Sequence, residues 1–330
     1  MVKKFIRRRG GKLKIGVVFG GKSAEHEVSL KSAKNIIEAL DKNKYDITPV
    51  KINKDGVFDI SILKKFDVIF PVLHGPFGED GSMQGVFKIL GIPFVGPGVL
   101  GSAVGMDKDV MKRLLSGAGI KNAKCIVLKS GDKIIFDKVK KTLGLPVFVK
   151  PANLGSSVGV SKVKNERDWQ RAIKNAFLYD TKVLVEEMVV GRELECAVLG
   201  NDKPMASKVG EVILNAEFYS YETKYIDADG AVTEIPAKNL PKSVEKKIQD
   251  IAIKTFQTLN CEGLSRVDVF LKENGDIYLN EINTLPGFTN ISMYPKLWEE
   301  SGVPLSKLLD KLVLLALERF KKEDKLYTSI

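Results

Sequence analysis

The residues best suited to chemistry lie on two short segments in the last third of the chain. Residues 263–271 and 277–283 alternate apolar and polar side chains on either side of Asn274-Gly275. This pattern predicts a β-hairpin, because Asn-Gly favours a tight turn between two strands. Since successive side chains of a strand point to opposite faces, we expect Arg266 and Asp268 on one face of the first strand.

The second strand of this hairpin carries Glu281 and Asn283, and a regular alternation places both on the face of Ile277 and Leu279. Two carboxylates and an amide oxygen, contributed by the two strands, form an oxygen-only set that suits Mg²⁺. Magnesium in turn indicates a phosphate-bearing substrate. A surface ion pair on the first strand, with a merely exposed Glu281, explains the hairpin sequence equally well.

Groups able to bind negative charge occur in three further places. Residues 150–159 form a glycine and serine loop entered by Lys150; it is no Walker A loop, but its N–H groups and hydroxyls can cover phosphates. Lys108 opens a helical pattern and is a second candidate cation. The turn that ends at Gly287 offers an N–H that, with the guanidinium of Arg266, can stabilise charge on a reacting carbonyl. Small-residue turns and solvated lysines without a ligand are the simpler interpretation of the loop and of Lys108.

Acidic side chains stand at the ends of other predicted strands. The run 183–193 leads from apolar residues into paired acids, so it can bind an adenine edge and a ribose hydroxyl, or it can be an edge strand protected by charge. Residues 20–29 and 74–81 follow strands at positions where open α/β sheets bind ligands. Glu25 can hold an ammonium group there, while His74 is equally consistent with a structural hydrogen bond.

The elements that must position these groups begin with a parallel α/β part. Strands predicted at 13–19, 45–52 and 66–73 alternate with helical patterns, and such crossovers imply a parallel sheet. The glycines at 91–105 indicate a boundary, and a helix is predicted at 106–115.

After Cys125 the predicted strands lie closer together, which indicates a mostly antiparallel α+β architecture. These strands are 147–150, 158–163, 183–188 and 194–199, with a helix at 166–177. Residues 215–236 lack periodicity and are long for a connection, so we expect a lid or binding loop. Apolar residues at helical spacing predict helices at 244–259 and 305–315.

Composition excludes some functional classes. The chain has 330 residues and a net charge of +11, but seven basic residues and no acid lie in the first 14, so the rest carries only +4. The basic character therefore belongs mainly to a tail rather than to a nucleic-acid-binding body. Three separated cysteines indicate neither a disulfide framework nor a zinc site, and no apolar run is long enough to span a bilayer. We expect a cytoplasmic protein.

Three motifs in order make the chain resemble the D-alanine:D-alanine ligases of the ATP-grasp superfamily. They are Gly20-Gly-Lys-Ser-Ala-Glu-His-Glu-Val-Ser29, His74-Gly-Pro-Phe-Gly-Glu-Asp-Gly-Ser-Met-Gln-Gly85, and Arg266-Val-Asp-Val-Phe with Glu281-Ile-Asn-Thr-Leu-Pro-Gly-Phe-Thr289. The resemblance implies an N-terminal parallel-sheet domain followed by a two-part ATP-grasp fold. The corresponding parts are a basic tail at 1–14, a substrate domain at 15–105, a central subdomain at 106–193 and a C-terminal subdomain at 194–330.

The resemblance also implies roles for the residues that match the family's motifs. The nucleotide contacts are Lys108, Lys150, Glu186, Glu187, Val189, Glu193 and Lys224, and the metal ligands are Asp268, Glu281 and Asn283. The substrate contacts are Glu25, His74, Ser292 and Met293, and the catalytic residues are Glu25, Ser156, Tyr225, Arg266 and Gly287. Ser156, Tyr225 and Glu25 are expected to form a network that closes the long loop over the site.

The implied reaction joins two D-alanines for peptidoglycan precursors through an acyl phosphate made from ATP. Two Mg²⁺ ions are expected, for which Mn²⁺ can substitute, and the family is homodimeric. Tyr225 favours the amide product over an ester with D-lactate, although Ser220 stands where the family often has an acid. The alternatives are a D-alanine:D-lactate or other carboxylate-amine ligase and, in another class, nucleic-acid binding through the basic tail. We expect neither a nucleic-acid nor a membrane partner.

Overall fold

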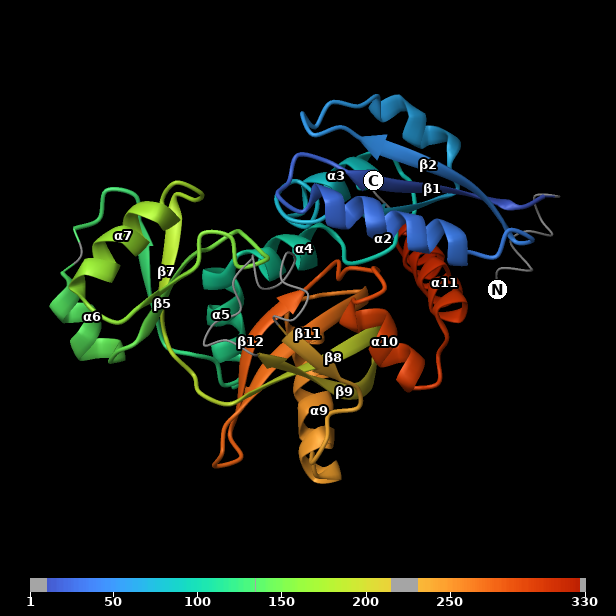
Figure 1. Cartoon of the computed structure of the whole chain (residues 1–330). Helices are drawn as coiled ribbons and strands as arrows, with labels where there is room; N and C mark the ends of the chain where they lie inside the picture. Colours follow the sequence, from blue (N-terminus) through green and yellow to red (C-terminus); the bar gives the residue numbers. More distant parts are fainter. Residues whose placement is uncertain (1–10, 134, 215–230, 327–330) are drawn as a thin grey trace.

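A computed structural model describes residues 11–133, 135–214 and 231–326, which form three β-sheets with helices packed on them (Figure 1). Lys224 and Tyr225, and most of the predicted loop at 215–236, lie outside the described residues. Within them, no helix is long and apolar enough to cross a bilayer.

The first sheet is parallel, as predicted, with the order β2-β1-β3. Its strands are β1 (Leu13–Gly20), β2 (Tyr45–Ile52) and β3 (Val68–Val72), and its helices are α2 (His26–Ala39), η1 (Ile60–Lys65) and α3 (Ser82–Ile89). Every residue of β3 is buried, because helices and strands cover both faces of a parallel sheet.

The second half of the glycine-rich stretch at 91–105 forms the helix α4 (Val99–Met106). A Cβ atom on Gly101 would lie 2.6 Å from the backbone oxygen of Asn260, and one on Gly105 would lie 2.6 Å from Thr284 Cγ2. These glycines therefore allow a helix to pack closely on the C-terminal part of the chain. The predicted helix at 106–115 is α5 (Lys108–Gly117).

The second sheet is antiparallel, with the order β4-β7-β5-β6. Its strands are β4 (Cys125–Lys129), β5 (Val147–Pro151), β6 (Ser161–Val163) and β7 (Lys182–Glu187). The helices α6 (Phe136–Leu143) and α7 (Glu166–Ala176) cover one face, where Val139 and Trp169 join the strand residues in a buried cluster (Figure 1).

The third sheet is also antiparallel and has the order β10-β9-β8-β11-β12. Its strands are β8 (Arg192–Gly200), β9 (Met205–Leu214), β10 (Ala231–Glu234), β11 (Gly263–Leu271) and β12 (Ile277–Asn283). The strand β10 falls within the predicted loop at 215–236, so that prediction is wrong for 231–234. Asn274-Gly275 forms the turn of the β11–β12 hairpin, as predicted.

Helices cover both faces of the third sheet. The helix α9 (Lys242–Thr258) packs on one face, whereas α10 (Met293–Glu300) packs on the other. The last helix, α11 (Leu305–Glu323), contacts α10 and also reaches α2 and β3 of the first sheet. One buried apolar cluster therefore runs from the first sheet into the C-terminal helices, which fixes the two parts against each other.

Candidate active site

The predicted metal ligands come together on the hairpin, but through a different geometry from the one expected. Asp268 lies opposite Glu281, and Arg266 lies opposite Asn283. The register then shifts by one residue, so that Val269 lies opposite Leu279 and Asn280 is the extra residue of a β-bulge.

This bulge corrects the predicted faces of the second strand. Regular alternation placed Glu281 and Asn283 with Ile277 and Leu279. Ile277 and Leu279 instead belong to the apolar cluster under α9. Glu281 and Asn283 lie on the other face with Asp268, because opposite residues of an antiparallel pair share a face. The oxygen-bearing groups are thus separated from the core.

Arg266 and Asp268 form an ion pair, although not the surface pair of the simpler interpretation. The guanidinium donates to both carboxylate oxygens of Asp268, at 2.7 Å each, and Nε lies 2.9 Å from Glu195 Oε2. Asp268 and Glu195 are buried, with 2% and 5% of their surfaces exposed. Burial opposes the charge of Arg266, but the two carboxylates outweigh it and raise the pKa of Arg266 well above its ordinary value.

The donor set fits Mg²⁺ in its chemistry. Asp268 and Glu281 offer carboxylate oxygens from facing positions, and Asn283 lies beside them, with Nδ2 3.0 Å from Asp268 Oδ2. In the described ranges, no three His, Cys, Asp or Glu side chains form a metal-binding group by themselves. A metal site here would combine the two carboxylates with the amide oxygen of Asn283.

Two predicted phosphate lysines form ion pairs with acids, Lys108 with Glu281 of the third sheet and Lys150 with Glu186 of the second. Lys108 Nζ lies 3.6 Å from Glu281 Oε2 and donates to the backbone oxygen of Leu154 at 2.7 Å. Lys150, at the end of β5, forms an ion pair with Glu186 on the neighbouring strand β7. Lys108 thus connects the α5 helix, the glycine and serine loop and the metal face.

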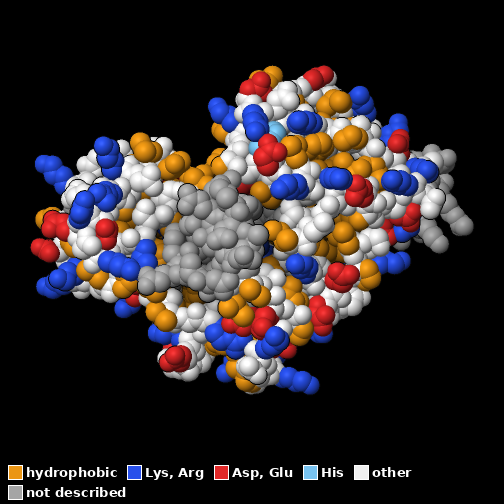
Figure 2. Space-filling view, in the orientation of Figure 1, with side chains coloured by type: hydrophobic (Ala, Val, Ile, Leu, Met, Phe, Trp, Pro, Cys, Tyr) orange, Lys and Arg blue, Asp and Glu red, His pale blue; other side chains and the backbone are white. Residues whose placement is uncertain are grey.

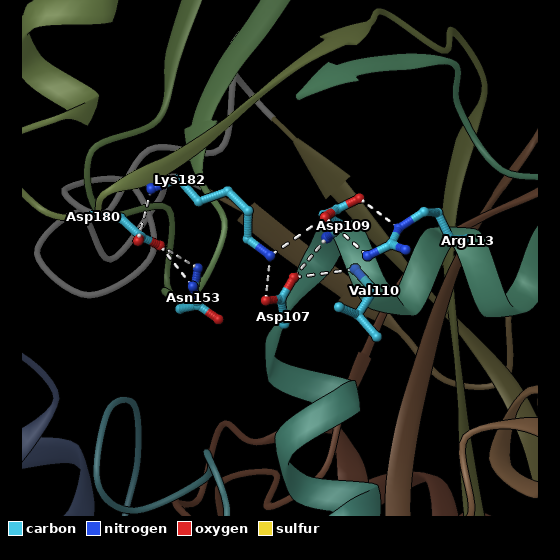
Figure 3. A network of polar contacts seen from close by, with 7 residues as sticks. All are labelled: Asp107, Asp109, Val110, Arg113, Asn153, Asp180 and Lys182. Carbon is cyan, nitrogen blue, oxygen red and sulfur yellow. Dashed lines mark hydrogen bonds and ion pairs between the residues drawn. The ribbon is translucent and has the colours of Figure 1, made fainter. Parts of the chain in front are cut away.

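A polar network fixes the start of α5, where Lys108 lies (Figure 3). Asp107 caps the helix by accepting from the N–H groups of Asp109 and Val110, at 3.1 Å each. Lys182 of β7 forms ion pairs with both Asp107 and Asp109. The position of Lys108 is therefore tied to the second sheet.

The N-terminal candidates meet the same loop from the other side. Glu25, before α2, accepts a hydrogen bond from the Ser156 hydroxyl, so two of the three residues of the predicted network are in contact. Nearby, the side chain of His74 is buried, and its Nδ1 lies 4.0 Å from Glu79 Oε1. Burial alone lowers the pKa of His74, but Glu79 and Glu25 outweigh burial and raise it.

A cavity of about 380 Å³ adjoins His74 at the carboxyl ends of the first sheet. Its lining includes Gly20, Gly21 and Ser23 of the first motif and Pro76 to Gly78 of the second. Both motifs therefore surround a hollow at the edge where parallel sheets bind ligands.

The turn after the hairpin brings Gly287 and Ser292 together. A Cβ atom on Gly287 would lie 2.9 Å from Ser292 Oγ, so a side chain would displace that hydroxyl. Ser292 Oγ accepts from the N–H of Thr289 at 2.9 Å, and Met293 is the first residue of α10. The predicted receptor for a carboxylate thus stands at a helix N-terminus, which favours negative charge.

The remaining nucleotide candidates follow β7. Glu187 accepts from the N–H of Lys124 at 2.8 Å, which fixes its side chain beside the residue that precedes β4. Val189 is half-buried in the connection to β8, and Glu193 lies opposite Phe270 of β11. These residues lie where the chain passes from β7 of the second sheet to β8 of the third.

Comparison with known proteins identifies the family. A family model described as the D-ala D-ala ligase C-terminus matches residues 114–314, and one described as the D-ala D-ala ligase N-terminus matches residues 14–62 and 59–97. The chain belongs to the D-alanine–D-alanine ligase family. Its structure accordingly has the ATP-grasp architecture that the motifs implied.

Individual relatives extend over nearly the whole chain. A D-alanine–D-alanine ligase of Oceanobacillus iheyensis is 52% identical, with 96% of this chain and 99% of the relative covered. The VanG D-Ala:D-Ser ligase of Enterococcus faecalis superposes with a TM-score of 0.84 at 38% identity, covering 92% of this chain and 99% of that one. A Bacillus anthracis D-alanine–D-alanine ligase complexed with ATP superposes with a TM-score of 0.80 at 32% identity, covering 94% and 99%.

One buried charge beside these candidate residues was missed from the sequence. Lys112 lies one helical turn after Lys108 on α5 and forms an ion pair with Glu186. Two lysines four residues apart share one face of a helix, so the spacing was the available signal. On a chain this rich in lysine, that spacing did not distinguish Lys112 from a solvated residue.

Proposed function

We infer that this protein joins two D-alanines into D-alanyl-D-alanine, using ATP and Mg²⁺, as a step in the synthesis of peptidoglycan precursors. The observation that carries the inference is the 52% identity, over nearly the full length of both chains, to a D-alanine–D-alanine ligase. The ATP-bound relative of the same fold supports the nucleotide.

The residue roles form part of this proposal. Glu25 holds the ammonium of the first D-alanine, whose carboxylate attacks the γ-phosphate of ATP and releases ADP. Arg266 and the N–H of Gly287 face the oxyanion that forms when the second amine attacks the acyl phosphate. Phosphate then leaves and the amide bond remains. The contact between Glu25 and Ser156 supports this assignment, because it joins the ammonium site to the loop proposed to cover the phosphates.

The second D-alanine and the nucleotide have their own contacts. We propose that Ser292 and the N–H of Met293 bind the carboxylate of the second D-alanine. Lys108 and Lys150, with Lys224, neutralise the phosphates. Asp268, Glu281 and Asn283 would hold Mg²⁺, and the bound ion would compensate further phosphate charge. The adenosine contacts are Glu186, Glu187, Val189 and Glu193.

The activity is tested with purified protein, ATP, Mg²⁺ and D-alanine. We expect ADP and phosphate in equal amounts and a dipeptide identified by its mass, and no dipeptide when the metal is removed by a chelator. Absence of dipeptide from all D-amino acids tested would sink the proposed function.

The choice of acceptor is tested separately. The VanG neighbour is named for D-serine, so D-serine and D-lactate compete with D-alanine in the same assay at neutral pH. We expect D-alanyl-D-alanine to predominate, on the basis of Tyr225. A preference for D-lactate would overturn that interpretation of Tyr225.

Assembly and organisation complete the proposal. We propose a cytoplasmic homodimer with functional units at 15–105, 106–193 and 194–330, which correspond to the three sheets except that the boundary at 193/194 falls inside β8 of the third sheet. Sedimentation velocity tests the dimer.

Basic and acidic side chains are interspersed on the face shown in Figure 2, which does not favour a nucleic-acid-binding body. If a chain starting at Lys14 bound DNA as well as the full chain, with the same steep salt dependence, the tail would not be the binding element.

A further inference from the structure

Glu186 is a buried carboxylate that contacts two lysines. Lys150 Nζ pairs with its Oε2, and Lys112 Nζ pairs with its Oε1. Glu186, Lys112 and Lys150 retain only 5%, 3% and 9% of their exposed surface. Lys112 Nζ also donates a hydrogen bond of 3.3 Å to the backbone oxygen of Ala123, which lies just before β4.

The two lysines reach Glu186 from different elements. Lys150 comes from the strand next to β7, at the entrance to the glycine and serine loop. Lys112 comes from α5, whose other buried lysine, Lys108, faces Glu281 instead. Burial raises the pKa of Glu186, but Lys150 and Lys112 outweigh burial and lower it, so the carboxylate is ionised at neutral pH.

The number of charges limits what Lys150 can do. A buried carboxylate left without a partner is strongly unfavourable. If Glu186 had Lys150 alone, movement of the Lys150 ammonium away from Glu186 toward a phosphate would leave the buried carboxylate unpaired. With Lys112 in place, the carboxylate keeps one cation when Lys150 turns away.

We propose that Lys112 is a positioning residue that holds the charge of Glu186, so that Lys150 is free to bind the phosphates of the nucleotide. This inference rests on the proposed function, because that function assigns Lys150 to the phosphates. Lys112 itself acts through Glu186 and touches neither the nucleotide nor the amino acids.

The test is the variant Lys112→Met, which keeps the apolar stem and removes the charge. Adenosine, ADP and ATP compete with a fluorescent nucleotide for the full-length protein. Lys150 should stay bound to Glu186 in the variant, so ATP affinity should fall by about tenfold or more while adenosine affinity changes little. In turnover, KM for ATP should rise more than KM for D-alanine.

Two further proteins make the result specific. Arg113→Met removes a positive charge from the next residue of α5, where the side chain is 70% exposed and pairs with Asp109, and it should leave all three affinities unchanged. The double variant Lys112→Met/Glu186→Gln has no carboxylate to neutralise. Both affinities should fall, because Glu186 is itself a proposed adenosine contact, but the ratio of ATP affinity to adenosine affinity should return to that of the unaltered protein. This double variant also serves if Lys112→Met does not fold.

The outcomes separate this inference from the proposed function. Equal losses for adenosine and ATP in Lys112→Met would place Lys112 in the base pocket and overturn the proposal. Unchanged affinities in Lys112→Met, or a double variant whose ratio of ATP affinity to adenosine affinity stays low, would also overturn it. If the unaltered protein binds ATP but makes no dipeptide, the proposed function fails while the nucleotide test of Lys112 still holds.

Discussion

Asp268 is the residue on which the metal face most depends, because its carboxylate is shared. It pairs with Arg266 through both oxygens and lies beside Asn283. Arg266 has a second carboxylate, Glu195, at 2.9 Å. The loss of one negative charge at Asp268 therefore leaves the guanidinium paired, while it removes a ligand from the proposed Mg²⁺ site.

We predict that Asp268→Asn abolishes turnover without unfolding the protein. The amide keeps the shape of the carboxylate, but the lost metal charge compensation should lower kcat by about a hundredfold or more. Dipeptide formation and circular dichroism measure the two effects. Asp276→Asn, in the exposed hairpin turn beside Lys121, is the matched control and should stay active. A folded, fully active Asp268→Asn protein would contradict the ligand role.

The groups around His74 predict the sign of one pH dependence in the N-terminal part. Its pKa is raised in the folded protein, with Glu79 the main raising partner against burial. Protonation therefore stabilises the fold fully below about pH 6.5, and this contribution is lost as pH rises through the higher folded value. His74→Asn should flatten the change in the free energy of unfolding between about pH 6 and pH 8. Denaturant titrations at several pH values measure the free energy of unfolding, and Glu79→Gln should also flatten its pH dependence. If the unaltered protein, His74→Asn and Glu79→Gln all showed the same pH dependence, His74 would not be the responsible group.

At the scale of elements, the bulge in β12 decides which side chains face the site. Leu279 lies opposite Val269 and Glu281 lies opposite Asp268, so Asn280 has no opposite residue on β11. Side chains on either side of the bulge therefore point to opposite faces although they are two residues apart. The bulge also bends the strand at the point where the metal ligands begin.

Deletion of Asn280 tests the bulge. Without Asn280, Leu279 and Glu281 become neighbours and alternate regularly, so the core and the metal face keep their own side chains and the protein should fold. The strand loses its local bend, which moves Glu281 and Asn283, and a shift of about 1 Å should lower kcat by about a hundredfold. Thermal unfolding and dipeptide formation check both parts. An unfolded deletion variant would show that the bulge serves the core rather than the site.

The sequence predicted the elements better than their relative placement. β2 has the predicted bounds, and the parallel and antiparallel sheets follow from apolar runs and connection lengths. The bulge was missed although the apolar positions of β12 change phase after Leu279, where the two polar residues Asn280 and Glu281 precede Ile282. Pairing with β11 shows that this change of phase is a bulge. The helix α4 was hidden because Gly101 and Gly105 indicate a loop locally, whereas their role is close packing against Asn260 and Thr284. Lys112 was missed since burial of a lysine depends on the distant Glu186.

At the scale of the whole molecule, the last helix fastens the first part of the chain to the third sheet. Arg319 of α11 is buried and donates to the backbone oxygens of Phe94 and Gly96. The same guanidinium lies over the Phe94 ring, 4.3 Å from its centre, and pairs with Glu262, just before β11, at 3.3 Å. One side chain thus joins three segments that are far apart in the sequence.

We therefore expect Arg319→Met to destabilise the protein in a pH-dependent manner. Loss of the guanidinium leaves two buried carbonyls without this donor and Glu262 without this cation, at a cost of about 3–5 kcal/mol at neutral pH. Burial already raises the pKa of Glu262, and Arg319 opposes that rise. Without Arg319 the pKa of Glu262 in the folded protein rises further. The free energy of unfolding should therefore fall more steeply in the variant as pH rises from about 4.5 toward neutrality. Denaturant unfolding at several pH values measures this. Arg319→Met/Glu262→Gln should remain destabilised but lose the added pH dependence; if the dependence persisted, another group would be responsible.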